Sequence, residues 1–224
     1  MEILGWLHEL ASRWTEYYQT YIGTGFVVTV QTTVLGTVLT AVWALVITAF
    51  RTSRIGLLRF IGITYIELFR GTPILVQLFT FFFALPLLIG VYLPPYATAV
   101  LVLALNAGGY LAESYRSGFE AVPKGQREAA AALGMTRAVA LRRVVMPLAL
   151  RIAVPAIGNT MIGILLTTPL TGVIGNPDMM FEASRAAGIS HDFSVFALIA
   201  LIYMVLGLML AWLNGRLERR LRLP

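Results

Sequence analysis

The chain has 224 residues, of which 58% are hydrophobic and 12% are charged, and its mean hydropathy is +0.79. A water-soluble fold of this size needs many more charges to cover its surface, so the composition indicates a membrane protein. The absence of cysteine excludes disulfides, thiol nucleophiles and cysteine-based metal sites. The two histidines, His8 and His191, are too far apart in the sequence to form a histidine metal cluster alone, and we expect no metal site.

Residues 1–22 predict an amphipathic helix that lies in the membrane interface. Apolar and aromatic residues recur at steps of three and four, and glutamates recur every seven residues on another face: Leu7, Leu10, Trp14, Tyr17 and Tyr21, and Glu2, Glu9 and Glu16. Tyrosine and tryptophan are the residues that favour the headgroup level. The simpler alternative is that this N-terminal segment only anchors the chain and has no further role. Without a basic start or a long apolar core, the segment is not expected to be a signal peptide.

Four later stretches contain no Asp, Glu, Lys or Arg: 26–50, 71–112, 152–177 and 193–215. A spanning helix needs about 20 mostly apolar residues, so the second stretch is long enough for two spans. Pro94 and Pro95 cannot continue a helix, so they mark a turn between these two spans. We therefore predict an all-α membrane protein with five transmembrane helices, at about 26–50, 72–90, 96–114, 153–174 and 193–214.

The basic residues indicate the orientation of these spans. Fifteen of the seventeen fall in the loops on one side, and the other side keeps only Arg13 and Arg185. Short cytoplasmic loops are rich in Lys and Arg, which predicts the N terminus outside and the C terminus, with a basic tail at 217–224, inside. The net charge of +6 is thus a topology signal and a weak signal for nucleic acid, which we do not expect as a partner.

The longest polar stretch, 113–151, predicts two short helices joined by a tight turn. Residues 126–133 are rich in alanine and strongly helix-forming. Gly134 suits a left-handed position that closes this helix, Thr136 can cap the second helix, and Pro147 is predicted to end it. Four consecutive alanines, 129–132, give the first helix a face of low bulk that is typical of a docking helix.

This loop resembles the EAA motif of permease subunits of bacterial ABC importers. The motif residues Glu-Ala-Ala, Gly, an aliphatic residue and a hydrophobic-Pro pair fall at the family's spacing, with Val and Met as mild departures: Glu128-Ala129-Ala130, Gly134, Val144 and Met146-Pro147. The resemblance implies the type I ABC importer permease fold over 23–216, with the coupling loop at 115–151. It implies that a separate ATPase docks on the loop through Arg127, Glu128, Ala129, Ala130, Gly134 and Pro147.

Other segments are similar to the polar amino-acid branch of that family, which includes histidine, glutamine, arginine and opine permeases. They are Glu67-Leu-Phe-Arg-Gly-Thr-Pro73, the run from Asn106 to Glu113, Val122-Pro-Lys-Gly-Gln126 and Leu217-Glu-Arg-Arg-Leu221. One segment departs from the branch: where it reads Lys-Asp-Thr-Ser-Leu, this chain has Thr167-Thr-Pro-Leu-Thr171. The solute therefore stays open between charged, polar and modified amino acids.

The resemblance also implies further partners in the bacterial inner membrane. These are a second permease, identical or similar, an extracytoplasmic substrate-binding protein and the membrane lipid. The chain has no Walker phosphate loop, since its only lysine, Lys124, lies in Pro-Lys-Gly-Gln. We therefore expect no cofactor in this chain, no catalytic residues, and ATP and Mg bound by the partner ATPase.

Polar residues within the spans are candidates for the substrate pathway, because an unpaired amide is costly in lipid and should face protein or a pathway. They are Gln77, Asn106, Asn159, Thr160, Thr167 and Thr168. Bonding between helices is the alternative role for Asn106 and Asn159. Charged residues near span ends are candidates for salt bridges or an inner gate: Glu67 with Arg70, and Glu113 with Arg116. Pro169 suggests a broken helix end, and residues 176–185 predict a short outer helix.

Three other functions are less consistent with the sequence. A helix-turn-helix DNA-binding protein has a similar outline, but both ends of the loop are tied to spans. An intramembrane enzyme would need a Ser-His, paired Asp or His-Glu-x-x-His arrangement, which no predicted span contains. A passive channel or a secondary transporter would need no docking loop, and the span centres lack the carboxylates of an ion relay.

Overall fold

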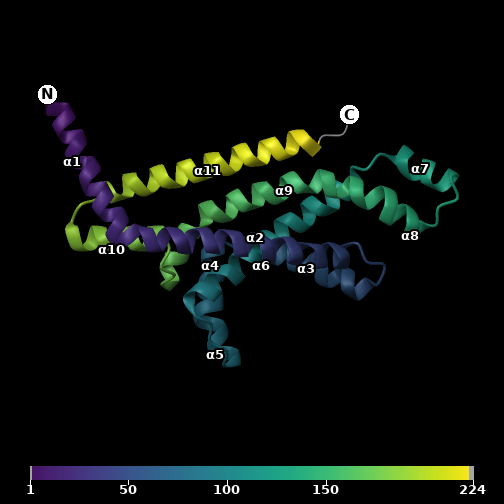
Figure 1. The fold of residues 1–224 in the computed structure, drawn as a ribbon. Coiled ribbons are helices and arrows are strands. Elements are labelled where there is room, and N and C mark those ends of the chain that lie inside the picture. The colour runs from purple at the N-terminus through teal and green to yellow at the C-terminus, as the bar shows by residue number, and fades with distance from the viewer. Residues whose placement is uncertain (1, 222–224) are drawn as a thin grey trace. The chain divides into compact units, whose positions relative to one another are not determined.

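In the computed structural model the described residues are 2–221, except for the side chains of Glu2, Ile3, Leu4, Trp6, Leu7, Arg127, Arg137, Leu150 and Ile152. Every regular element in this described part is a helix, which confirms the predicted all-α class. The elements in chain order are α1 (Glu2–Tyr17), η1 (Tyr18–Ile22), α2 (Gly23–Arg51), α3 (Gly56–Gly71), α4 (Ile74–Phe79), η2 (Thr80–Ala84), α5 (Leu85–Ile89), α6 (Pro95–Glu120), α7 (Lys124–Ala132), α8 (Arg137–Ala140), η3 (Leu141–Val145), α9 (Met146–Thr167), η4 (Thr168–Ile174), α10 (Met179–Ser190) and α11 (Ser194–Leu221) (Figure 1).

Four helical stretches are long and apolar enough to cross a membrane by themselves: His8–Arg51, Pro95–Glu120, Ala153–Ile174 and Ser194–Leu221. The pair Gly56–Gly71 and Ile74–Ile89 passes the same test only when it is counted as one broken span, which gives up to five. The predicted break before the third span is confirmed, because Gly90 ends α5 in the left-handed conformation and α6 begins at Pro95.

The sequence analysis missed the helix α3 and placed residues 51–71 in a loop. Three arginines in this region, Arg54, Arg59 and Arg70, hid its apolar periodicity. Thr72 is extended, at φ −115° and ψ 141°, since a residue before proline disfavours the helical region. The sequence predicts a basic loop followed by a straight span at 72–90. In the structure a helix, α3, precedes the break at Thr72 and Pro73, and α4 follows it.

The prediction that Pro147 ends the second loop helix is wrong. The chain stays helical from Arg137 to Thr167, with the π-helix η3 ending two residues before the proline. The N–H of Met146 donates to the carbonyl of Leu141, five residues back, which is the wider π spacing. This wider turn accommodates a residue that lacks an N–H and whose ring crowds the preceding turn, so Pro147 lies inside the helix.

The chain divides into two compact units. Unit 1 comprises Met1–Gly36, Ile74–Val102 and Gly163–Met209, and unit 2 comprises Thr37–Pro73, Leu103–Ile162 and Leu210–Pro224. The core of unit 1 contains Leu78, Ala99, Val102 and Ile174, packed against Ile74, Phe81 and Phe82. Its α10 is joined to α2, because the N–H of Met179 donates to Thr29 Oγ1 at 3.1 Å.

The main core of unit 2 lies between α2, α3, α6 and α9. Its buried members are Ala44, Ile47, Ile66, Leu111, Ala112, Tyr115 and Ala153. Two threonine hydroxyls of α2 lie within hydrogen-bond distance of backbone carbonyls of α6: Thr40 Oγ1 is 3.4 Å from the carbonyl of Ala104, and Thr48 Oγ1 is 3.1 Å from that of Ala112. Threonines here satisfy their own polar groups while joining helices, as is common in membranes.

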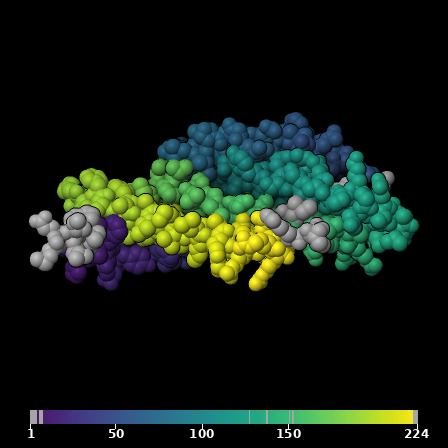
Figure 2. Space-filling model, turned by 90° about the horizontal axis from the view of Figure 1, so that it is seen from above, coloured from purple at the N-terminus to yellow at the C-terminus, as the bar shows by residue number. Residues whose placement is uncertain are grey.

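Large apolar side chains remain exposed along the spans, as expected for helices that face lipid. The helix α11, yellow in Figure 2, lies at the surface in this view. Its exposed residues include Leu201, Met204, Val205, Leu208, Met209, Trp212 and Leu213.

Candidate functional site

The coupling loop consists of α7, a tight turn and the helix that begins with α8, which lie side by side in unit 2 (Figure 1). The turn is closed by Gly134 at φ +71°, the left-handed conformation that the sequence predicts for it. Its N–H donates to the carbonyl of Ala131 at 2.9 Å, and the N–H of Met135 donates to Ala130 at 3.1 Å. The N–H of Val139 donates to Thr136 Oγ1 at 3.4 Å, which confirms the predicted cap.

The base of this loop is held by a small apolar cluster. Val122, Val145 and Ala149 are buried there and pack against Phe119 and Leu148. The opposite face of α7 is exposed: Glu128, Ala129, Ala131 and Ala132 all reach solvent, and Leu133 is 75% exposed. The loop thus exposes mostly small and apolar side chains on α7, and a buried apolar cluster holds it in place. This is the geometry of a docking helix.

The six predicted coupling residues differ from one another in their exposure to solvent. Glu128, Ala129 and Gly134 are exposed and accessible to a partner, whereas Ala130 is 2% exposed and packs inside the loop. Pro147 is exposed within α9. Arg127 lies in α7, but its side chain is outside the described residues.

A cluster of four charged residues lies at the end of α6 in unit 2. The predicted pair of Glu113 and Arg116 is present, with Oε2 and Nε at 2.8 Å. The sequence analysis missed its two neighbours: Arg51 Nε lies 3.5 Å from Glu113 Oε1, and Arg116 Nη1 lies 2.6 Å from Glu120 Oε1. The spacing of Glu120 four residues after Arg116 could have indicated this second pair.

Within the described residues, Glu67 and Arg70 form no ion pair. The guanidinium of Arg70 instead lies over the ring of Tyr110, 5.2 Å from its centroid, in a cation–π contact. Arg70 and Glu113 line the same cavity of about 530 Å³, together with Tyr110, Ser114 and Ser117. Of the four predicted gate residues, Arg70, Glu113 and Arg116 are therefore connected through this cavity and the ion pair. Glu67 is exposed elsewhere on α3.

Three of the predicted pathway residues belong to unit 2, and two of them bond between helices. Asn106 Nδ2 donates to the carbonyl of Phe69 in α3 at 2.9 Å. Asn159 Oδ1 accepts from Asn214 Nδ2 of α11 at 3.0 Å. Thr160 donates to Ala156 one turn earlier in its own helix. The interhelical role that the sequence left open for Asn106 and Asn159 is therefore realised.

The other three predicted pathway residues, Gln77, Thr167 and Thr168, belong to unit 1. Gln77 is buried in α4, and Thr167 donates to the carbonyl of Gly163 at 2.7 Å. Thr168, at the start of the 3₁₀ turn η4, is fully buried and lies 3.0 Å from the hydroxyl of Tyr203.

This contact is part of a buried polar network that the sequence analysis missed. The hydroxyl of Tyr203 also donates to Asp178 Oδ2 at 3.3 Å, and Asp178 Oδ1 accepts the N–H of Phe181 at 2.9 Å, which caps α10. Next to it, Asn176 Nδ2 donates to Thr171 Oγ1 at 2.8 Å. The cap was detectable, because Asp178 precedes a helix-forming run, but nothing in the sequence connects it to Tyr203.

Burial raises the pKa of the Asp178 carboxyl to about 6, although hydrogen bonds from Phe181 and Tyr203 act in the opposite direction. Asp192, between α10 and α11, behaves differently. The pKa of its carboxyl is lowered, first by the N–H of Ser194, which donates to Oδ1 at 2.8 Å. The Tyr17 hydroxyl at 3.0 Å and Arg13 at 3.4 Å contribute to the same effect and join α1 to this loop.

Comparison with known proteins identifies the family. Residues 41–223 match the family described as "Binding-protein-dependent transport system inner membrane component". The chain is 33% identical over 199 residues to the L-cystine transport system permease protein TcyB of Bacillus subtilis (strain 168), covering 88% of this chain and 85% of the relative. It is 35% identical over 165 residues to the glutamine transport system permease protein GlnP of Escherichia coli (strain K12), covering 73% and 75%.

Solved structures have the same fold. A crystal structure of an amino acid ABC transporter with histidines contains a chain that is 33% identical, with a TM-score of 0.86 and coverage of 94% of this chain and 96% of that one. An inward-facing MetNI methionine ABC transporter is 18% identical, with a TM-score of 0.71 and coverage of 92% and 97%, and supports the fold alone. The chain therefore belongs to the inner membrane components of binding-protein-dependent transport systems: it is a multi-pass permease subunit of an ABC importer, a transporter component rather than an enzyme, and such subunits work with a separate ATPase and a substrate-binding protein.

Proposed function

We propose that this chain forms the translocation pathway for a polar amino acid and that a separate ATPase drives it by docking on the exposed face of α7. The observation that carries the proposal is the coupling loop itself. Glu128, Ala129 and Leu133 are exposed beside a left-handed Gly134, on a base held by Val122 and Val145. A rigid base lets a force applied at the docking face reach the spans rather than bend the loop.

The proposed complex contains two permeases, related by an approximate two-fold axis along the membrane normal. Five spans per subunit are few to enclose a polar solute, and the second subunit is this chain again or a similar one. ATP and Mg bind in the ATPase, and an extracytoplasmic protein delivers the solute. The N terminus lies outside and the C terminus inside, as the distribution of basic residues indicates.

A polar amino acid is the proposed solute class, because the relatives named above serve L-cystine and glutamine and the solved relative is an amino acid transporter. The candidates for contact with the solute stay Gln77, Asn106, Asn159, Thr160, Thr167 and Thr168, of which Asn106 and Asn159 also bond between helices. None of these is charged, so hydrogen bonds and the shape of the pathway would select the solute, and the binding protein would set its identity.

The test is uptake by proteoliposomes that contain the permease with the ATPase and binding protein encoded beside it. Labelled L-glutamine, L-arginine and L-cystine are supplied outside, with ATP inside. We expect ATP-dependent uptake of at least one of them. Uptake without an ATPase, or uptake of none of the three with active ATPase, would contradict the proposal.

The role of the loop is tested by Gly134→Val. A β-branched residue at a positive φ costs about 1–2 kcal/mol, so the turn should rearrange and transport should fall severalfold at normal membrane level of the protein. Gly125→Val in α7 is the matched control, because neither glycine has an atom within 4 Å of an added Cβ and only Gly134 has a positive φ. Equal uptake by the two variants would remove this turn from the coupling mechanism.

A further inference from the structure

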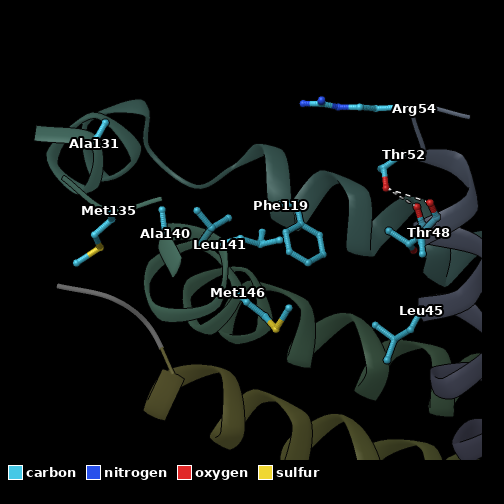
Figure 3. Close-up of a pocket in the computed structure, with 12 residues that line it drawn as sticks. Leu45, Thr48, Thr52, Arg54, Phe119, Ala131, Met135, Ala140, Leu141 and Met146 are labelled. Carbon is cyan, nitrogen blue, oxygen red and sulfur yellow. Dashed lines mark hydrogen bonds between the residues drawn. The ribbon is translucent and has the colours of Figure 1, made fainter. Parts of the chain in front are cut away.

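A cavity of about 810 Å³ lies beside the coupling loop within unit 2 (Figure 3). Its volume falls in the range of small-molecule sites. One wall comes from α2, one from the loop and η3, and Phe119 of α6 lies between them. The lining is mostly apolar and consists of Leu45, Thr48, Ala49, Thr52, Arg54, Phe119, Ala131, Met135, Ala140, Leu141, Val145 and Met146.

The two hydroxyls in this lining are already used. Thr48 Oγ1 donates to Ala44 at 2.7 Å and contacts the carbonyl of Ala112 at 3.1 Å, and Thr52 Oγ1 donates to Thr48 at 2.8 Å. Neither hydroxyl hydrogen is therefore free to bind a ligand. The cavity suits an apolar ligand that needs no hydrogen bond from its walls.

Arg54 is the charged residue of the lining. In Figure 3 its side chain extends from the α2 side of the group toward the α8 side. No carboxylate of the described residues forms an ion pair with it. It follows α2 directly, past the end of the apolar stretch, where the headgroups of a bilayer are expected. The cavity thus combines apolar walls with one cation at headgroup level.

Two residues of the lining, Leu45 and Ala49, belong to the exposed surface of α2. Val38, Val42, Leu45 and Ala49 are exposed and follow one another at steps of four, three and four, so they form one stripe on this helix. The stripe rises about 16 Å at 1.5 Å per residue, which is about half of the 30 Å hydrocarbon thickness. One acyl chain of the adjacent leaflet can therefore follow the stripe from Arg54 upward.

We propose that this cavity is a binding site for an anionic phospholipid, with its phosphate at Arg54 and one acyl chain along α2 against Leu141 and Met146. Basic pockets between spans on the cytoplasmic side are the sites that such headgroups favour. Because Ala131, Met135 and Ala140 of the loop form one wall, the bound lipid supports the docking helix. The site itself needs only the membrane, whereas its effect on ATP use rests on the docking proposed above.

The experiment measures lipid that co-purifies with the complete transporter, by native mass spectrometry. Wild type should retain phosphatidylglycerol or cardiolipin in preference to phosphatidylethanolamine. Arg54→Gln should reduce this retention about fivefold, as expected for the loss of about 1 kcal/mol of attraction. Ala49→Phe should reduce it by filling the apolar wall. The controls are Arg59→Gln, an exposed arginine of α3, and Ala211→Phe, an exposed alanine of α11, neither of which lines the cavity.

Equal lipid retention by Arg54→Gln and Arg59→Gln, or by Ala49→Phe and Ala211→Phe, would overturn the site. A preference for phosphatidylethanolamine would also overturn it. So would a crosslink from Leu141→Cys to a second permease or to the ATPase in place of lipid. The effect on coupling is read separately in nanodiscs, where added phosphatidylglycerol should raise the ATPase rate of wild type more than that of Arg54→Gln. Lipid retention without this difference would limit the lipid to a structural role. If the wild-type transporter took up no amino acid, the proposed function would be contradicted, but the lipid measurement would still stand.

Discussion

Asp178 combines two roles that oppose each other. Its carboxylate caps α10 through the N–H of Phe181, which favours the charged form, while complete burial beside Tyr203 disfavours it. Burial has the larger effect, and the pKa rises from 3.8 to about 6. Close packing contributes, because a Cβ on Gly25 would lie 2.9 Å from the backbone of Asp178. This carboxyl group is therefore expected to be costly for folding at neutral pH.

The replacement Asp178→Asn tests this cost. The folded protein holds the proton more tightly than the unfolded chain, so the carboxyl group favours folding most below pH 4, and this contribution is lost as the pH rises through 6. A shift of about two units corresponds to about 3 kcal/mol. Asparagine keeps the cap and removes the charge. The melting temperature of the variant, relative to wild type, should therefore rise between pH 5 and pH 8.

Asp192→Asn is the control for this experiment. The pKa of Asp192 is lowered by the N–H of Ser194, so its stabilisation is present above the unfolded pKa and is lost only as the pH falls through the lower folded value. Its replacement should lower the melting temperature by the same amount at pH 5 and at pH 8. A parallel pH dependence for both variants would mean that burial of Asp178 does not control its titration.

The residues that sequence analysis located correctly act through local backbone geometry. Gly134 closes its helix at a positive φ, and Thr136 caps the next one, because both roles depend on neighbours a few residues away. Asp178 and Tyr203 meet only through tertiary packing across 25 residues. The burial of Ala130 beside its exposed neighbours Ala129 and Ala131 likewise depends on which face of α7 rests on the loop.

Between elements, α9 and α11 approach closely where Asn214 lies over Gly158. A Cβ on Gly158 would stand 2.0 Å from Asn214 Oδ1 and 2.2 Å from its Cγ. Asn214 Nδ2 also donates to the carbonyl of Pro155 at 3.1 Å and to Asn159 Oδ1 at 3.0 Å. The absence of a side chain at Gly158 is thus what permits both hydrogen bonds.

We expect Gly158→Ala to lower the melting temperature of the purified complex, because Asn214 must leave this position and overpacking costs about 1–3 kcal/mol. The double variant Gly158→Ala with Asn214→Ala removes the collision, so its loss should be smaller than the sum of the two single losses. Gly163→Ala is the control in the same helix, with no atom within 4 Å of the added Cβ. Additive losses would show that the two residues do not interact.

Among the elements, long apolar runs were predicted well, whereas only some of the interruptions were. The break before Pro95 was correct because a left-handed Gly90 and two prolines reinforce each other. Pro147 was misread as a helix end, since a π turn at Leu141–Val145 can accommodate a proline and has no clear sequence pattern. Glycine positions are equally hard to interpret from sequence, because Gly158 lies against Asn214 whereas Gly163, in the same helix, has open surroundings.

For the whole molecule, the composition predicted the class and the span number within the range that the structure allows, four helices or five with the broken pair. It did so because lipid requires apolar side chains and internal hydrogen bonding over a fixed length. The helix α3 was missed because its arginines resemble those of a cytoplasmic loop. The orientation depends on the same arginines and rests on the charge count alone.

The orientation is tested with single cysteines, since the chain contains none. Ser12→Cys in α1, Ser184→Cys in α10 and Ala132→Cys in α7 are all at exposed positions. Because fifteen of the seventeen basic residues are assigned to the cytoplasmic side, the first two cysteines should react with a membrane-impermeant maleimide in cells with an opened outer envelope. The cysteine at 132 should react only after the inner membrane is permeabilised. Labelling of position 132 from outside would invert the topology and place the docking face where no ATPase can reach it.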